Sequence, residues 1–119
     1  MNADKVKATL GQYQSLVARL SYLDEVIYTC ENKNISTSDK ILYDRAKSEY
    51  KDVINQMYKI NMLIDRVDNP LYKTLLEKYY IQGEKIDAIA YDTTYSNRWV
   101  YKSIKKAIEQ IAEKENCDF

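Results

Sequence analysis

Four basic side chains lie close together near the C-terminus with no acidic residue among them: Arg98, Lys102, Lys105 and Lys106. On an α-helix, at about 100° per residue, the four fall on one side. Arginine can pair bidentately with guanine, and lysine neutralises phosphate groups. We therefore predict that this face binds double-stranded DNA, and the alternative is an ordinary solvated helix face.

The residues around these cations complete the predicted contact surface. An asparagine can pair bidentately with adenine, so Asn97 and Arg98 are the predicted base readers, and the lysines are predicted phosphate contacts. The predicted DNA-binding residues are Ser96, Asn97, Arg98, Tyr101, Lys102, Lys105 and Lys106. Trp99 has two interpretations: it stacks on the sugar–phosphate backbone, or it packs in the core or against the N-terminal part of the chain.

Three short helical patterns position this surface, over about 70–80, 85–91 and 97–115. Asn69 is a suitable N-cap before Pro70, Gly83 can supply the positive φ that ends the first helix, and Ser96 can cap the third. The apolar residues of the third helix should face the other two: Val100, Ile104, Ala107, Ile108 and Ile111. The tight connection before the third helix is typical of a helix–turn–helix.

The N-terminal part predicts two long helices, over about 3–31 and 39–67, with a possible bend at Gly11. The second helix carries a heptad stripe of Tyr43, Ala46, Tyr50, Val53, Met57, Ile60, Ile64 and Val67. The predicted fold is therefore all-α: a long antiparallel helical hairpin, residues 1–68, followed by a three-helix helix–turn–helix unit, residues 69–119.

Two helices cannot enclose a core, so part of the heptad stripe needs a further partner. We predict a homodimer in which two hairpins pack as a four-helix arrangement through a seam of Tyr43, Tyr50, Met57 and Ile64. In the alternative geometry the C-terminal unit folds back along the hairpin, with Trp99 as the wedge, and the chain stays a monomer.

Composition limits the chemistry that the 119 residues can perform. Lys plus Arg equals Asp plus Glu at 18 each, so any attraction for DNA must come from a local patch. The chain has no histidine, which argues against an imidazole base. It has two glycines, which are too few for a phosphate-binding loop of either common type. We expect no enzyme activity, no catalytic residue, no metal and no cofactor. Cys30 and Cys117 have no metal or redox spacing, and no apolar stretch is long enough to span a membrane.

The C-terminal motifs resemble region 4 of bacterial sigma factors. The matching residues are Leu75-Leu76, Tyr80-Ile-Gln-Gly83, Ile86, Ile89-Ala90, Ser96-Asn-Arg-Trp-Val100 and Lys106-Ala107-Ile108. Two positions depart from that pattern: Thr94 stands where a glycine usually makes the turn, and Asp87-Ala88 replaces an acidic residue directly before Ile-Ala. A long hairpin stands in place of sigma region 2, so the chain resembles the small sigma-like regulators of phages and mobile elements in low-GC Gram-positive bacteria. These include the late-gene and autolysin-regulator (ArpU-type) families and related uncharacterised phage proteins.

The resemblance implies a DNA-binding transcriptional regulator of phage or mobile-element genes in the cytoplasm of a bacterial host. Because region 4 of sigma factors also contacts RNA polymerase, an alternative is a protein-binding module that modulates or inhibits polymerase or another host or phage factor. A third interpretation is a small DNA-packaging subunit, which would form a ring.

Overall fold

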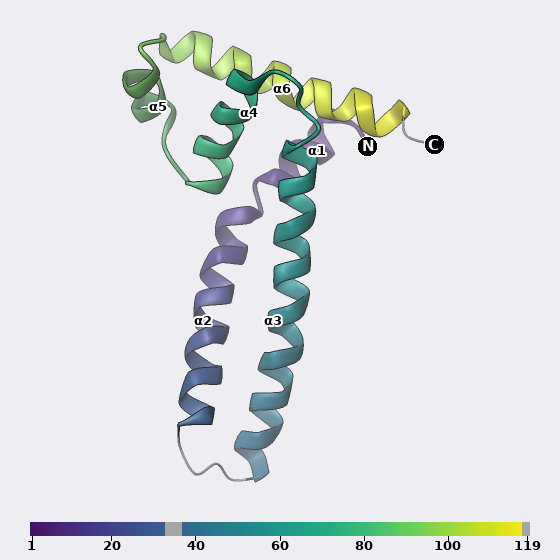
Figure 1. Cartoon of the computed structure of the whole chain (residues 1–119), viewed down its shortest axis with the longest axis vertical. Helices are drawn as coiled ribbons and strands as arrows, with labels where there is room; N and C mark the ends of the chain where they lie inside the picture. The colour runs from purple at the N-terminus through teal and green to yellow at the C-terminus, as the bar shows by residue number, and fades with distance from the viewer. Residues whose placement is uncertain (33–36, 118–119) are drawn as a thin grey trace. The chain divides into compact units, whose positions relative to one another are not determined.

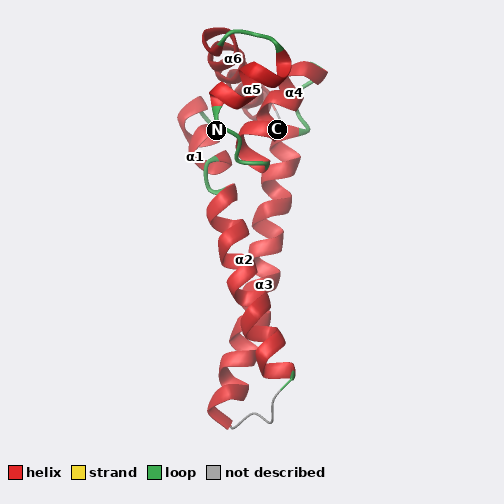
Figure 2. Ribbon diagram, turned by 90° about the vertical axis from the view of Figure 1, so that its left-hand side faces the viewer, coloured by secondary structure: helices red, strands yellow, loops and turns green. Residues whose placement is uncertain are grey.

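A computed structural model of the chain describes residues 1–32 and 37–117, with the side chains of residues 37, 38, 116 and 117 outside the description. All regular secondary structure in this part is helical, which confirms the predicted all-α class (Figure 1; Figure 2). The elements are α1 (Ala3–Leu10), α2 (Tyr13–Glu31), α3 (Thr37–Ile64), α4 (Pro70–Leu76), the π-helical turn η1 (Glu77–Ile81), α5 (Ile86–Thr93) and α6 (Asn97–Cys117). None of the described helices combines the length and the hydrophobicity that crossing a bilayer requires.

The chain divides into two compact units, which we describe separately. The hairpin unit comprises Ser15–Lys59, and the helix–turn–helix unit comprises Met1–Gln14 together with Ile60–Phe119. The predicted boundary at residues 68 and 69 coincides with the connection between α3 and α4. The helix–turn–helix unit, however, also takes in the start of the chain and the last turn of α3, because apolar side chains there are buried with those of the C-terminal helices.

In the hairpin unit, α2 and α3 run antiparallel (Figure 1), as the sequence predicts. Its core is thin: Leu23, Ala46 and Val53 form a buried cluster. Partly buried side chains surround that cluster: Leu16, Leu20, Val26, Ile27, Tyr50 and Met57. Polar contacts join the two helices at the surface, where Arg19 donates to both carboxylate oxygens of Glu49 at 2.7 and 2.9 Å.

Residues of the predicted dimer seam make contacts within their own chain. Tyr50 and Met57 pack against the hairpin cluster, and the Tyr43 hydroxyl donates to Glu31 at 2.9 Å. Ile64 is 1% exposed and belongs to the helix–turn–helix unit, so its side chain is not on an open seam. Exposed apolar residues of the hairpin unit instead lie elsewhere: Val17, Tyr22, Tyr28, Ile41, Leu42, Ile54 and Tyr58.

In the helix–turn–helix unit, α6 packs against α1, α4 and α5. Its predicted apolar face is buried as expected, at Val100, Ile104, Ala107, Ile108 and Ile111. The contact with α1 was not predicted, because the sequence pattern assigned residues 3–31 to the hairpin. The chain bends at Gly11 and Gln12, where a bend was expected as possible, and α1 buries Val6 and Leu10 in this unit.

The helix ends follow from local sequence. The side chain of Asn69 accepts hydrogen bonds from the amides of Leu71 and Tyr72 at 2.9 and 3.3 Å, which starts α4. Gly83 has φ of 71°, the conformation that lets the chain leave η1 and begin α5. The side chain of Gln14 closes the end of η1, because its amide donates to the carbonyls of Tyr80 and Ile81 at 3.0 and 2.7 Å.

Candidate nucleic-acid interface

Helices α5 and α6 are joined by a turn of Thr94, Tyr95 and Ser96, in the arrangement that the sequence predicts. Thr94 ends α5 with φ of 62° and ψ of 15°, a left-handed conformation. The hydroxyl of Ser96 accepts from the amide of Trp99 at 3.1 Å, so the predicted cap of α6 is confirmed. The turn therefore fixes where α6 begins.

The first residue of α6 is tied to α5. The side-chain amide nitrogen of Asn97, Nδ2, donates to the carboxylate of Asp87 at 2.6 Å. This bond holds the N-terminus of α6 against the start of α5. Bidentate pairing with adenine uses both the amide nitrogen and the amide oxygen. The side-chain amide of Asn97 has two N–H donors, so its second N–H and its oxygen remain available for a base while Asp87 accepts from the first N–H.

The four predicted cations all lie on the open side of α6. Arg98, Lys102, Lys105 and Lys106 are exposed and span an arc of about 100° around the helix. Within the part of the chain that the structure describes, none of them has an ion-pair partner. We call these four residues the cationic face. An anion that approaches this face meets charges that the protein itself does not neutralise.

Aromatic side chains border the cationic face on both flanks. Trp99 stacks on Tyr95, with ring centroids 3.9 Å apart and an angle of 21° between the rings. The local partner of Trp99 is thus the turn itself, and the side chain is half-buried. On the other flank, Tyr101 is 56% exposed. Flat, partly exposed rings beside cations suit contacts with sugars and bases.

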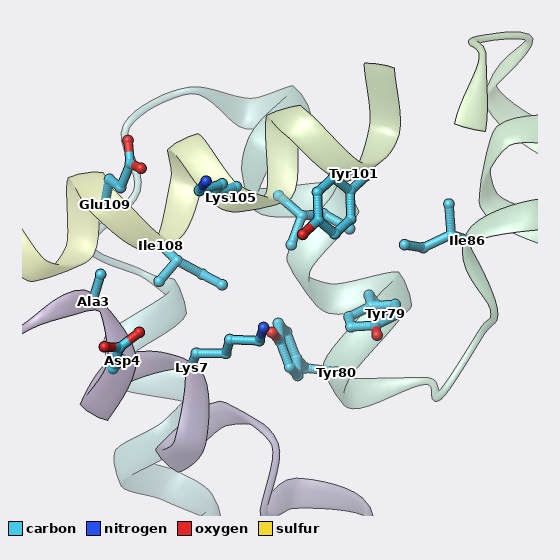
Figure 3. Close-up of a pocket in the computed structure, with 11 residues that line it drawn as sticks. Ala3, Asp4, Lys7, Tyr79, Tyr80, Ile86, Tyr101, Lys105, Ile108 and Glu109 are labelled. Carbon is cyan, nitrogen blue, oxygen red and sulfur yellow. The ribbon is translucent and has the colours of Figure 1, made fainter. Parts of the chain in front are cut away.

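A cavity of about 280 Å³ lies beside the same helix (Figure 3). Side chains from α1, η1, α5 and α6 line it, among them Lys105 and Tyr101 of the predicted DNA surface. This cavity was not predicted, because α1 supplies one wall and periodicity does not show where α1 packs. Burial raises the pKa of the Tyr80 phenol, which lines the cavity, to about 12.

The described residues offer no cluster of three or more His, Cys, Asp or Glu side chains that could hold a metal ion. Cys30 is buried in the hairpin unit, and the side chain of Cys117 lies outside the described residues.

These observations define a small all-α chain in which a helical hairpin accompanies a helix–turn–helix with a cationic outer face. The chain belongs to a protein family of unknown function, DUF1492, whose model matches residues 34–112. That match extends from the start of α3 to within the last turns of α6. Neither the curated proteins nor the solved structures contain a significant match.

We expect Thr94→Asn to stabilise the protein by about 0.5–1 kcal/mol. A left-handed conformation is costly for a β-branched residue, whereas asparagine tolerates it. Equilibrium urea unfolding should show a higher midpoint with an unchanged slope. The matched control is Thr74→Asn on the exposed surface of α4, where the backbone is right-handed and no gain is expected. Equal effects of the two substitutions would show that Thr94 carries no strain.

Proposed function

We propose that this protein is a non-catalytic transcriptional regulator that binds double-stranded DNA through α6 and acts on phage or mobile-element genes in the bacterial cytoplasm. The observation that carries the proposal is the unpaired cationic face on the helix that follows the turn. The resemblance to sigma region 4 supports the choice of transcription as the process.

The alternative of an ordinary solvated helix face agrees less well with the charges. On α3, lysines and acids are interleaved, as Asp44, Lys47, Lys51 and Asp52 show. On α6, by contrast, no acid occurs between Arg98 and Ile108. Since the whole chain is neutral, a local excess of positive charge is the form that attraction for DNA must take.

The position of each side chain supports a division of roles. Arg98 lies in the first turn of α6, the end that enters the major groove in helix–turn–helix proteins, and is the proposed guanine reader. Asn97 can join it through its oxygen and the N–H that does not bind Asp87. Lys102, Lys105 and Lys106 lie further along α6 and are proposed to contact phosphates, with Ser96 and Tyr101 at the border of the contact surface.

The double substitution Arg98→Glu/Lys102→Glu should abolish DNA binding without unfolding the protein, because both side chains are exposed and neither has an ion-pair partner among the described residues. Binding is measured by fluorescence anisotropy on a duplex selected from random DNA, with circular dichroism as the folding check.

The single variant Lys106→Gln should lower the slope of log affinity against log salt by about one.

The matched control is Lys47→Glu/Lys51→Glu on the exposed surface of α3, which reverses the same charge outside the interface. Its DNA affinity should stay close to that of the wild type apart from a small long-range effect. Unchanged binding by the α6 variant would move the DNA site away from this helix.

We further propose that the protein acts as a homodimer joined through the hairpin unit. The described part of this unit buries four apolar side chains, Leu23, Cys30, Ala46 and Val53. Several large apolar side chains remain exposed, including Ile54 at 41% and Tyr58 at 64%. Ile54 and Tyr58 are four residues apart and so lie on one side of α3. A second hairpin would cover them and build the four-helix core that two helices cannot.

Ile54→Lys/Tyr58→Lys should convert the dimer into a folded monomer, because exposed side chains can be replaced without opening the core of the hairpin. The measurement is sedimentation velocity at micromolar concentration, and the wild type should sediment at twice the 14.0 kDa chain mass. Met57→Lys is a poorer test, since Met57 packs against the core of its own hairpin. Asn55→Lys is the matched control. A wild type that sediments as one chain would end the dimer proposal.

The same exposed apolar surface favours a second candidate function, in which the hairpin binds RNA polymerase or another host or phage protein. A tagged chain would then retain that protein from host lysate after nuclease treatment, and Ile54→Lys/Tyr58→Lys would release it. Arg98→Glu/Lys102→Glu should leave this retention unchanged. Retention that disappears with nuclease, or with the α6 variant, would mean that DNA mediates the association.

A further inference from the structure

We infer that the cavity beside α6 binds a small aromatic amino acid, in the form of the free zwitterion. The volume of the cavity is about 280 Å³, close to the lower end of the range for small-ligand sites and large enough for one such molecule. Its walls come entirely from the helix–turn–helix unit, so the unit builds the site by itself. Three groups of side chains follow one another along the cavity.

Aromatic and apolar side chains form one end of the cavity. Figure 3 shows Tyr79 and Tyr101 there, near Ile86. Tyr79 and Tyr80 meet edge to face, with ring centroids 4.8 Å apart; Tyr80 is 8% exposed, and Tyr101 leaves this end partly open to solvent. Ring edges and faces at this spacing suit a further aromatic ring, which would extend the same packing.

Two cations lie in the middle of the cavity. Lys7 comes from α1 and Lys105 from α6, and Figure 3 shows both between the aromatic end and the opposite end. Within the described part of the chain, neither ammonium group is paired with a carboxylate. Two unpaired ammonium groups on facing helices provide a site for a carboxylate.

Two acids form the other end. Asp4 and Glu109 lie there with Ala3 between them in Figure 3. They too have no ion-pair partner among the described residues, although a lysine lies three or four residues away from each on its own helix. These acids oppose a ligand with net negative charge. They favour a ligand that presents an ammonium group to the acids, a carboxylate to the lysines and a ring to the tyrosines.

Isothermal titration calorimetry of the whole protein with three probes tests this arrangement of aromatic, basic and acidic side chains along the cavity. L-Phenylalanine carries the ring and both charges, 3-phenylpropionate lacks the ammonium group, and phenethylamine lacks the carboxylate. We expect one molecule of L-phenylalanine to bind per chain. Each analogue should bind at least about fivefold more weakly, because it lacks one charge-assisted contact at a partly exposed site.

Two variants assign the charges to their partners. Lys105→Gln should weaken the binding of L-phenylalanine and 3-phenylpropionate by about fivefold and should not weaken that of phenethylamine, whose ammonium group Lys105 repels. Glu109→Gln should weaken the binding of L-phenylalanine and phenethylamine and should not weaken that of 3-phenylpropionate, whose carboxylate Glu109 repels. Lys47→Gln and Asp52→Asn, both on exposed positions of α3, are the matched controls. No saturable heat with L-phenylalanine would overturn the site, and equal binding of all three probes would overturn the zwitterion.

The site has a consequence that rests on the proposed function. Tyr101 and Lys105 line the cavity and also belong to the proposed DNA surface, so a bound amino acid should compete for them. Saturating L-phenylalanine should therefore lower the affinity for a selected duplex by about the factor that Lys105→Gln lowers it. Unchanged DNA affinity at saturating ligand would overturn this competition. If the protein binds no duplex at all, the proposed function fails while the titration still decides the ligand site.

Discussion

The helix–turn–helix unit depends on the burial of one wide face of α6. Val100, Ala107 and Ile111 are completely buried, and neighbouring side chains widen this face well beyond a narrow stripe. A face of that width needs more than one covering helix, and α1, α4 and α5 share the task. The opposite side of α6 is then left for charged side chains. Packing on one side of the helix thus fixes the orientation of the cations on the other.

The start of α6 is held by polar contacts as well as by packing. Ser96 caps the first turn, Asn97 binds Asp87, and Thr94 adopts a left-handed conformation that a glycine would adopt more easily. A threonine in this conformation is strained, because a branched side chain disfavours positive φ. The Ser96 cap and the bond between Asn97 and Asp87 therefore order the end of α6 that faces the proposed target, and the strain at Thr94 opposes them.

Sequence reasoning succeeded where structure depends on neighbours in the chain. The caps Asn69 and Ser96, the positive φ of Gly83 and the apolar face of α6 all follow from local chemistry or helical periodicity. It failed for contacts between distant segments. Gly11 indicates a possible bend between α1 and α2, but periodicity continues across it, so nothing in the pattern shows that Val6 and Leu10 pack in the helix–turn–helix unit. The cavity was missed for the same reason, because its walls come from four segments.

The hairpin unit raises the opposite problem, because its periodicity predicts more burial than one chain provides. A regular heptad stripe runs along α3. Among the stripe residues that the structure describes in this unit, Ala46 and Val53 are buried, and Tyr43, Tyr50 and Met57 are half-buried. Side chains off the stripe, such as Ile54 and Tyr58, are more exposed still. Large apolar side chains repeated along an exposed helix contribute little to the stability of a single chain. This exposed apolar surface is what the proposed dimer of hairpins would cover.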